Sequence, residues 1–353
     1  MMAKDKLPKE LSSNTQWDQS ESPIWLGSCF TLKRNLQDQL FPAKAPNGLK
    51  VQLFDLLKEA FLKTKAIDNA QIFPSHELSA QEKDLLFEHY LVDSCSLREE
   101  KGLGLVIDGT NRFLGFLNFQ DHLTLMWSTE QKQWQKTWLK LQNLERELSE
   151  KLVFAYSPRF GYLTHHIFEA GTAFICLAYL HLPALIQSGT IESMKDELKE
   201  LGLKILGIEK SENEFVGDLI ILQNRYTLGL PEEEILKSVH SGANKLVSQE
   251  LQEREKLIDD PRIKDQISRA FGLLTHSYEL HAKETLNALS ALKLGIHYNY
   301  LKGIDDKELS KLFFHSRQAH LTTLHNQSLN REELLHKRSE YLQEKLRSSS
   351  LKI

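Results

Sequence analysis

Apolar and polar positions follow two different patterns along the chain, and these divide it into a mixed part and a helical part. Short apolar runs typical of strands occur at 24–32, 103–107, 113–118 and 123–127. The dipeptide Asp108-Gly109 separates the second run from the third and is a strong turn signal. The segment 103–127 is therefore predicted to form an antiparallel meander.

Apolar residues spaced three and four positions apart predict helices on both sides of this meander. The predicted helices span 49–65, 81–90, 131–151, 171–188, 191–201 and 230–258. Further strands are expected at 153–156, 203–208 and 216–223. Beyond the helix breaker at 259–261, which reads Asp-Asp-Pro, only helical patterns follow.

These patterns predict three parts. Residues 1–22 are polar and charged and are expected to form a flexible tail. Residues 23–261 are expected to form an α+β domain, in which helices flank an antiparallel sheet. Residues 262–353 are expected to form an all-α domain.

Composition excludes functional classes more than it identifies one. Of the 353 residues, 41% are hydrophobic and 26% charged, and the net charge is −4, so no nucleic-acid or membrane surface is expected. No apolar run reaches the roughly 18 residues of a membrane span, and the N-terminal segment lacks the apolar core of a signal peptide. The scattered Cys29, Cys95 and Cys176 fit a reducing cytosol and suggest neither a disulfide framework nor a metal cluster. We expect a cytoplasmic protein without a metal site.

The most informative segment, 160–175, reads FGYLTHHIFEAGTAFI, and HLPAL follows at 181–185. It resembles the signature of the ATP:guanido phosphotransferases, in particular the bacterial protein arginine kinases. In that branch the segment usually reads FGYLTSCPTNVGTGLR and is followed by HLPAL. Scaffold residues such as Gly161, Thr164 and Gly171 agree with it.

Other segments extend the resemblance over nearly the whole chain after residue 23. IWLGSCFTLKRNL at 24–36 resembles the family's VVLSSRIRLARNL, NFQDH at 118–122 resembles NEEDH, and NRYTLG at 224–229 resembles SNxxTLG. Residues 269–274, 283–286 and 289–296 resemble the helical domain specific to protein arginine kinases. The order and spacing of these motifs imply the family's fold, a catalytic-type α+β domain followed by a helical C-terminal domain.

The family transfers the γ-phosphoryl group of ATP to a guanidinium nitrogen. This chemistry needs positive charge around the phosphates and a carboxylate that orients the guanidinium. By resemblance, the nucleotide-site positions are Ser28, Cys29, Thr31, Tyr90, Thr124, Ile175, Leu206 and Gly207. The catalytic glutamate falls on Phe119 or Gln120, the reactive cysteine on His166, and the family's asparagine on Glu169. Five arginines and the catalytic carboxylate are therefore replaced.

The size of this loss decides the expected activity. A hydrogen bond to a charged group contributes roughly 1.5–3 kcal/mol, so losing five arginines removes about 6–10 kcal/mol even with strong non-additivity. At about 1.4 kcal/mol per tenfold change, ordinary ATP affinity disappears. The prediction is a pseudokinase that binds no cofactor and keeps its shape for binding.

The resemblance also implies partners. They are the zinc-binding activator protein of the kinase and the AAA+ unfoldase and stress-repressor machinery of protein quality control. A homodimer is expected, because active relatives are homodimers. The apolar residues between 262 and 295 predict that the C-terminal domain mediates this self-association.

Two other functions stay open. Lys33 shares a strand face with Cys29 and Thr31, and Lys204 and Lys210 flank the Leu206 position. An active guanidino kinase with a rebuilt phosphate site would bind Mg-ATP through these lysines. Alternatively, the old cleft holds a different anionic ligand.

Three smaller features bear on these alternatives. Gly171-Thr172 is a phosphate-binding feature that is kept, if a helix begins there. His165 and His166 point opposite ways if they lie on a strand, so they would not chelate one ion. Of the family's RDxxRA phosphoarginine pocket, the matching stretch 334–339 keeps Arg338 alone.

Overall fold

The computed structural model describes the chain except residues 1–6, 9–10, 12–13, 19, 93–99 and 326–328, so Cys95 lies outside the described residues. The chain forms two compact units. Unit 1 comprises residues 1–8, 27–177 and 223–239, and unit 2 comprises residues 9–26, 178–222 and 240–353. In the part of the chain that the structure describes, no helix is both long and apolar enough to cross a membrane.

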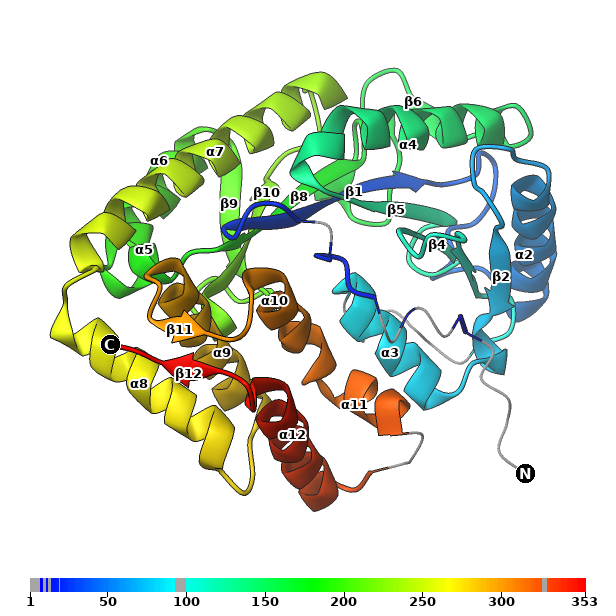
Figure 1. The fold of residues 1–353 in the computed structure, drawn as a ribbon. Coiled ribbons are helices and arrows are strands. Elements are labelled where there is room, and N and C mark those ends of the chain that lie inside the picture. The colour runs from blue at the N-terminus through cyan, green and yellow to red at the C-terminus, as the bar shows by residue number, and fades with distance from the viewer. Residues whose placement is uncertain (1–6, 9–10, 12–13, 19, 93–99, 326–328) are drawn as a thin grey trace. The chain divides into compact units, whose positions relative to one another are not determined.

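The main sheet has eight strands in the order β2-β3-β4-β5-β1-β8-β10-β9 (Figure 1). The first five are β2 (Gln71–Pro74), β3 (Gly104–Ile107), β4 (Phe113–Leu117), β5 (Leu123–Thr129) and β1 (Trp25–Arg34). The predicted antiparallel meander is confirmed, with Ile107 opposite Leu114 and Phe113 opposite Trp127. β1 pairs antiparallel with β5, so the strand with the first expected site positions is an inner strand.

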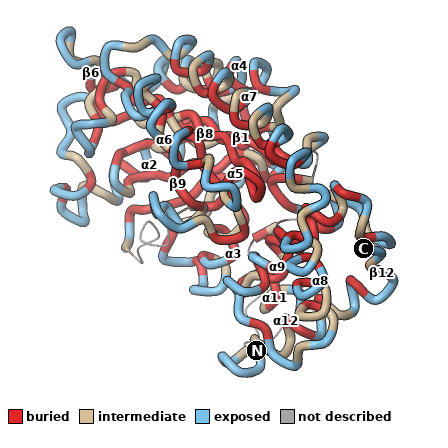
Figure 2. The backbone as a smooth tube through the Cα atoms, turned by 90° about the vertical axis from the view of Figure 1, so that its left-hand side faces the viewer, coloured by how far each residue is buried: buried red, intermediate tan, exposed pale blue. Residues whose placement is uncertain are grey.

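The helices of unit 1 include α2 (Asn47–Leu62), α3 (Ala80–Tyr90) and α4 (Trp134–Ser149). α3 begins at a capping box formed by Ser79 and Glu82. α4 lies across β1 and β5 (Figure 1), and the rings of Trp134 and Trp138 lie 4.8 and 6.5 Å from the Phe30 ring. The face of β1 that carries Phe30 is therefore core beneath α4, and Figure 2 shows β1 almost entirely buried.

The prediction of a helix at 171–188 is wrong. This segment forms the strand β8 (Phe174–His181) and then the short helix α5 (Pro183–Gln187). β8 lies between β1 and β10 and is buried along nearly its whole length. A strand buried on both faces has a continuous apolar run, which periodicity cannot distinguish from a buried helix. Pro183 begins α5 at its first position, as proline's fixed φ favours.

Three antiparallel pairings involve the segment that precedes β8, and one of them is a bridge between Tyr162 and Gly171. The strand predicted at 153–156 is reduced to a single bridge between Leu36 and Phe154. β6 (Tyr156–Ser157) and β7 (Gly161–Tyr162) then form a short hairpin of their own. This hairpin leads into the loop that carries His166.

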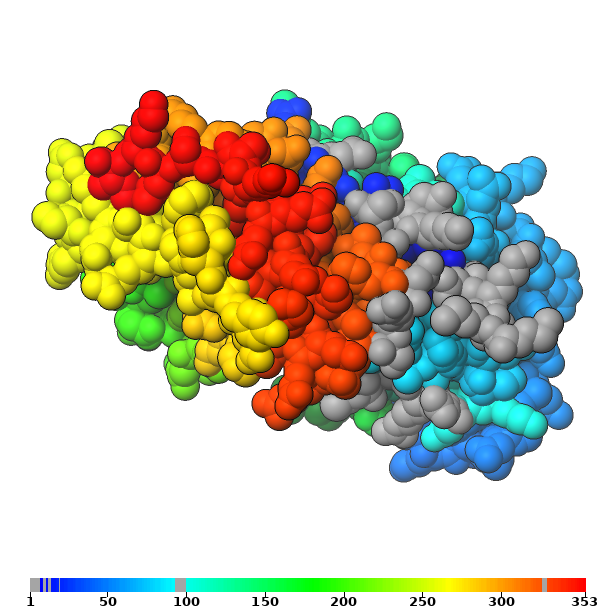
Figure 3. Space-filling model, turned by 60° about the horizontal axis from the view of Figure 1, so that its bottom comes forward, coloured from blue at the N-terminus to red at the C-terminus, as the bar shows by residue number. Residues whose placement is uncertain are grey.

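Unit 2 contains the other end of the sheet and most helices of the last third. β9 (Leu203–Gly207) and β10 (Leu219–Asn224) are neighbours, as predicted, and α6 (Thr190–Glu200) precedes them. The helices that follow are α7 (Glu232–Leu257), α8 (Pro261–His276), α9 (Ala282–His297), α10 (Asp306–His315), α11 (Gln318–His325) and α12 (Arg331–Leu346). β11 (Leu301–Lys302) pairs with β12 (Ser350–Leu351). Figure 3 shows the C-terminal residues, in red, against α8, in yellow.

The helix break predicted at 259–261 is present, because Asp260 caps α8 and Pro261 is its first residue. The compact units, however, do not divide there. α9 is the buried centre of unit 2 and contacts the 3-10 turn η5 (Val216–Asp218), where the Gly217 N–H donates to Asn287 Oδ1 at 2.7 Å. The C-terminal helices thus share a core with residues 178–222.

The described part of the expected N-terminal tail includes a packed segment. Trp17 is 2% exposed, and its ring lies 4.6 Å from Phe314 and 6.3 Å from Tyr179 within unit 2. Asp18 closes a turn by accepting hydrogen bonds from the N–H and hydroxyl of Thr15. The polar residues around Trp17 conceal this anchor in the sequence, so the flexible-tail prediction does not hold for residues 15–18.

Candidate functional site

Alternation along β1 divides its side chains between two faces. Phe30, Leu32 and Arg34 point to the side that α4 covers. Cys29, Thr31 and Lys33 point to the opposite side, as the sequence predicted for the lysine. Cys29 and Thr31 are buried, with 1% and 6% of their surface exposed.

The neighbouring strands add two more expected positions to this side. Thr124 on β5 lies directly opposite Lys33 in the antiparallel register. Directly before β8, the Ala173 carbonyl accepts a hydrogen bond from the Lys33 N–H at 3.1 Å. Phe174 packs on Trp138 of α4, so Ile175, the next residue, points the other way. We call the set Cys29, Thr31, Lys33, Thr124 and Ile175 the β1 face.

Ala173 preserves an unusual backbone conformation beside this face. Its φ is +50°, in the left-handed region, and the residue is fully buried. The family signature has glycine at this position, which adopts such a φ without strain. The fold has therefore kept the turn into β8 although the residue has changed.

The β1 face carries a cation, but that cation is engaged. Lys33 Nζ forms an ion pair and hydrogen bond with Glu169 Oε2, and the two side chains are 11% and 25% exposed. Glu169 stands where the family has asparagine. The remaining members are a thiol, two hydroxyls and an aliphatic side chain. The face therefore offers little net positive charge to a triphosphate.

The turn between β4 and β5 holds Phe119 and Gln120, the two positions expected, by the resemblance, for the catalytic glutamate. Asn118 has φ +62°, and its N–H donates to the His122 carbonyl to close the turn. Phe119 packs edge-on against Phe116, with ring centroids 5.3 Å apart, and Gln120 is exposed. Neither side chain carries a charge.

The following Asp121 and His122 support the fold and do not form an acid–base pair. Asp121 Oδ1 accepts hydrogen bonds from Asn35 Nδ2 and from the His165 N–H, each at 2.6 Å. Burial raises the pKa of Asp121 against the opposing effect of these donors. Burial also lowers the pKa of His122 to about 4, so its ring is neutral, and Nδ1 lies 2.9 Å from Asn35 Oδ1 and 3.2 Å from the Leu36 nitrogen. These contacts tie β1 to the turn and to the signature loop.

The signature loop, residues 164–170, is braced by its backbone and exposes its side chains. The Thr227 hydroxyl donates to the Ala170 carbonyl at 2.7 Å, and Thr164 Oγ1 donates to the His166 carbonyl at 2.7 Å. His165 and His166 are exposed in this loop and not on a strand, so the strand alternation on which their predicted orientation rested does not apply. Their rings lie 4.8 Å apart. Ile167 and Phe168 follow, 78% and 86% exposed.

Two other expected site positions, Tyr90 and Ser28, are buried in the fold, and a third expected feature is absent. Tyr90 is 3% exposed at the end of α3, and its hydroxyl donates to the Phe113 carbonyl at 3.3 Å. Burial raises the pKa of Tyr90 well above its usual value. Ser28 is buried opposite Thr129 and, by alternation, belongs to the α4 side of β1. Gly171-Thr172 precedes the strand β8, so the helix N-terminus proposed for phosphate binding is absent there.

Leu206 and Gly207 belong to unit 2, at the end of β9. Leu206 is 7% exposed. A Cβ on Gly207 would come within 2.0 Å of the Glu214 carbonyl oxygen, so glycine is required where the charged loop 209–214 closes on the strand. Lys204 is partly exposed on the same strand, and Lys210 lies in that loop with φ +64°. In the C-terminal helices, Arg338 is buried and donates to the Ser316 and Leu280 carbonyls, so it braces α12.

Sequence reasoning missed Arg34. Its guanidinium is buried and donates to Glu145 Oε1 at 2.6 Å and to the Thr172 carbonyl at 2.9 Å, and it stacks 3.5 Å from the Tyr162 ring centroid. The signal was present, because the family motif also has arginine at this position. Arg34 links β1, α4 and the turn into β8 on the side away from the β1 face.

The comparisons with known proteins agree with this geometry. Residues 52–253 match the family model described as ATP:guanido phosphotransferase, C-terminal catalytic domain. The chain belongs to the ATP:guanido phosphotransferase family. Residues 260–352 match the model of the protein-arginine kinase McsB C-terminal domain, which assigns the chain to the protein-arginine kinase branch.

Curated members of the family match along their whole length. A protein-arginine kinase of Halothermothrix orenii is 30% identical over 98% of this chain and 99% of its own length. A protein-arginine kinase of Chlamydia pneumoniae is 32% identical over 96% of this chain and 97% of its own. The resemblance stated from the motifs is therefore confirmed at the level of family and branch.

Solved structures of the family support the fold. A lombricine kinase matches with a TM-score of 0.58 at 18% identity, over 70% of this chain and 72% of its own. The substrate-free duplicated taurocyamine kinase of Schistosoma mansoni matches with a TM-score of 0.59 at 19% identity. That match covers 75% of this chain, which spans 39% of the duplicated protein. The predicted fold, an α+β catalytic-type domain with an antiparallel sheet followed by C-terminal helices, is confirmed.

Proposed function

We propose that this chain is a non-catalytic member of the protein-arginine kinase branch that acts as a binding or scaffold partner in protein quality control. The observation that carries the proposal is the ion pair between Lys33 and Glu169 on a face that holds no arginine. Where the family surrounds the phosphates with guanidinium groups, this face has Cys29, Thr31, Thr124 and Ile175. Its lysine is already paired with an acid.

Phosphate binding requires charge that this face lacks. Arginine suits the task because its planar fork bonds two phosphate oxygens and stays charged. A threonine hydroxyl supplies a neutral hydrogen bond, worth about 1 kcal/mol, and a cysteine thiol supplies less. To bind a phosphate, Lys33 would first have to leave Glu169. Mg-ATP is therefore expected to be neither a ligand nor a cofactor.

The missing carboxylate supports the same proposal. Gln120 and Phe119 are neutral, and the adjacent Asp121 holds the fold through Asn35 and His165. General-base catalysis contributes about 10²–10⁴-fold to a rate. Phosphoryl transfer would lack that factor even if ATP were bound.

The family resemblance suggests the partners of such a protein. We propose that it acts in the cytosol as a homodimer and binds the zinc-binding activator of the kinase or the AAA+ unfoldase and its stress repressor. The braced signature loop fits a binding role, because Ile167 and Phe168 are held on a hydrogen-bonded backbone with their side chains in solvent. Large exposed apolar side chains of this kind mark interaction sites.

One observation favours a second function. Lys33 and Glu169 bring a cation and a carboxylate together on the β1 face. If the pair opened, the lysine could contact a phosphate while the carboxylate oriented a guanidinium. The chain would then be an active protein-arginine kinase with a rebuilt site and would bind Mg-ATP.

Calorimetric titration with Mg-ATP separates the two functions. The scaffold proposal predicts no saturable heat up to millimolar nucleotide for the wild-type chain and for Lys33→Met. A micromolar isotherm that Lys33→Met removes would establish the rebuilt site instead.

A further inference from the structure

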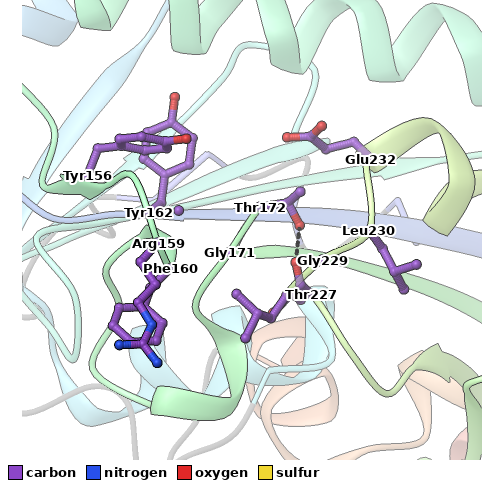
Figure 4. Close-up of a pocket in the computed structure, with 12 residues that line it drawn as sticks. Tyr156, Arg159, Phe160, Tyr162, Gly171, Thr172, Thr227, Gly229, Leu230 and Glu232 are labelled. Carbon is purple, nitrogen blue, oxygen red and sulfur yellow. Dashed lines mark hydrogen bonds between the residues drawn. The ribbon is translucent and has the colours of Figure 1, made fainter.

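Unit 1 contains a pocket of about 440 Å³ that the family chemistry does not explain. The β6–β7 hairpin forms one wall with Tyr156, Phe160 and Tyr162 (Figure 4). The segment entering α7 forms the other wall with Leu230 and Glu232. Arg34 stacks on Tyr162, and Arg34 points away from the β1 face. The pocket therefore lies on the side of Arg34 and is distinct from the expected nucleotide positions.

The first wall is aromatic and partly open to solvent. Tyr156 is 60% exposed and Phe160 is 44% exposed, far more than rings in a core. Tyr156 meets Tyr162 nearly at right angles, with ring centroids 5.4 Å apart. Aromatic faces attract cations through the ring quadrupole, most strongly when water is excluded.

The opposite wall carries an acid. Glu232 is half-buried, and Figure 4 shows its carboxylate pointing across the pocket toward the tyrosine rings. Within the described residues, no cation forms an ion pair with it. Burial raises the pKa of Glu232, and the charges of Glu233 and Glu145 act in the same direction, while a backbone hydrogen bond and the charge of Arg34 lower it. A further cation in the pocket would relieve the remaining cost.

The contacts of Arg34 with the aromatic wall indicate which kind of cation fits the pocket. Arg34 lies on Tyr162 at 3.5 Å and bonds Glu145 at 2.6 Å, so one side of this wall already holds a guanidinium between a ring and a carboxylate. The open side offers the same two partners, the exposed rings and Glu232. A planar guanidinium can stack on a ring and bond a carboxylate at once, which an ammonium group does less well.

The pocket is also held in shape. Thr172 Oγ1 and the Thr172 N–H both donate to the Thr227 carbonyl, at 3.1 and 3.0 Å. Gly171 approaches so closely that a Cβ there would lie 2.4 Å from the Thr227 oxygen. A preformed pocket binds with less ordering cost than a mobile one.

We propose that this pocket binds an exposed arginine side chain of a partner protein, with its guanidinium between the aromatic wall and Glu232. The site is additional to the proposed scaffold function and rests on the geometry of unit 1 alone. Arg159 sets one limit on affinity. Its guanidinium lies 5.1 Å from the Phe160 ring and competes for the same aromatic surface.

The test is a saturation-transfer NMR titration with three peptides of sequence acetyl-Gly-Ser-X-Ser-Gly-amide, where X is arginine, lysine or citrulline. The arginine peptide should bind saturably. The citrulline peptide, which keeps the shape without the charge, should bind about 10- to 100-fold more weakly, as expected when a charged hydrogen bond is lost. Binding of the lysine peptide should be intermediate. The proposal is overturned if the arginine peptide does not bind, or if either of the others binds as tightly.

Three folded variants locate the site. Glu232→Gln should weaken arginine-peptide binding about 10- to 100-fold. Glu233→Gln, a change at the adjacent exposed acid, should leave it unchanged. Arg159→Gln should strengthen binding several-fold by removing the competitor, and misfolding cannot produce such a gain. Equal binding by wild type and Glu232→Gln, or equal losses in both glutamate variants, would overturn the assignment. Because no nucleotide is present, the result is independent of the ATP titration.

Discussion

Lys33 on β1 and Glu169 in the signature loop form an ion pair across 136 residues of sequence. By the resemblance, the pair lies beside positions expected for the phosphate-binding arginines, and Glu169 takes the position of the family's uncharged asparagine. It anchors the loop to the sheet and neutralises the lysine of the β1 face. The same contact therefore holds the signature loop on the sheet and removes the free positive charge of the β1 face.

The stability of the loop should depend on this pair. Glu169→Gln leaves a largely buried Lys33 without its carboxylate, and it should lower the free energy of unfolding by about 1–3 kcal/mol. Urea denaturation of the two proteins measures the difference. Glu59→Gln is the matched control, because Glu59 pairs with Lys63 on the surface, at 63% and 61% exposure, and should change nothing measurable. Equal effects of the two substitutions would show that the Lys33 pair is no stronger than a surface pair.

A buried carboxyl group should make stability depend on pH. Asp218 of unit 2 accepts a hydrogen bond from Ser290, and burial raises its pKa to about 6 from 3.8. Between these values the unfolded chain has lost the proton while the folded chain keeps it. The contribution of Asp218 to stability is therefore greatest below pH 4, falls as the pH rises to about 6, and stays lower above that.

Asp218→Asn should remove the loss of stability above pH 4 that Asp218 causes, because the amide stays neutral. At pH 7.5 it should stabilise the protein by about 2–3 kcal/mol, and at pH 4 by much less. Urea denaturation at both pH values is the measurement. Asp38→Asn is the control, because Asp38 is exposed and its φ of +58° is close to the +52° of Asp218. A gain that is the same at both pH values would mean that backbone preference, and not burial, produces it.

Gly171 should tolerate no side chain. Its φ is +108°, and a Cβ would lie 2.4 Å from the Thr227 carbonyl oxygen, so Gly171→Ala should cost about 2–4 kcal/mol of unfolding free energy. Gly48→Ala is the comparison, because that glycine lies in α2 with nothing within 4 Å of the added carbon. It should be neutral or stabilising by up to about 1 kcal/mol. A small effect at Gly171 would mean that the turn into β8 can move.

Self-association should involve the α8–α9 groove of unit 2. The groove has a volume of about 690 Å³, and Ala270, Leu273, Ala288 and Ala291 contribute its apolar lining. Leu273→Glu should convert the expected homodimer to a monomer in light scattering, because it introduces charge into that lining. Leu251→Glu, at a 41% exposed position of α7, is the control. A dimer that survives Leu273→Glu would lie on another surface.

The sequence predicted the parts of the fold in which local pattern and final environment agree. The meander at 103–127 was correct because the turn at Asp108 separates runs of strand length. β8 was mistaken for a helix because a strand buried on both faces loses its alternation. Trp17 was assigned to a tail because its polar neighbours dominate the local composition.

The candidate site, like the fold, was predictable from the sequence only in part. That Cys29, Thr31 and Lys33 share a face followed from alternation alone. The Glu169 partner could not be predicted, because no local pattern links a strand to a loop 136 residues away. Arg34 could have been found, since it is an arginine that the family motif also carries. The pocket beside it could not, because three separate segments form its walls.

The central claim, that the chain transfers no phosphoryl group, is tested most directly by a phosphoarginine assay. Purified wild-type chain is incubated with Mg-ATP labelled in the γ-phosphate and an arginine-rich acceptor protein, beside the protein-arginine kinase of Chlamydia pneumoniae, Lys33→Met and Glu169→Gln. The account predicts no acid-labile label above the enzyme-free blank for the wild-type chain or either variant. Label transferred by the wild-type chain and abolished by Lys33→Met or Glu169→Gln would contradict it and make the chain an active kinase with a rebuilt site.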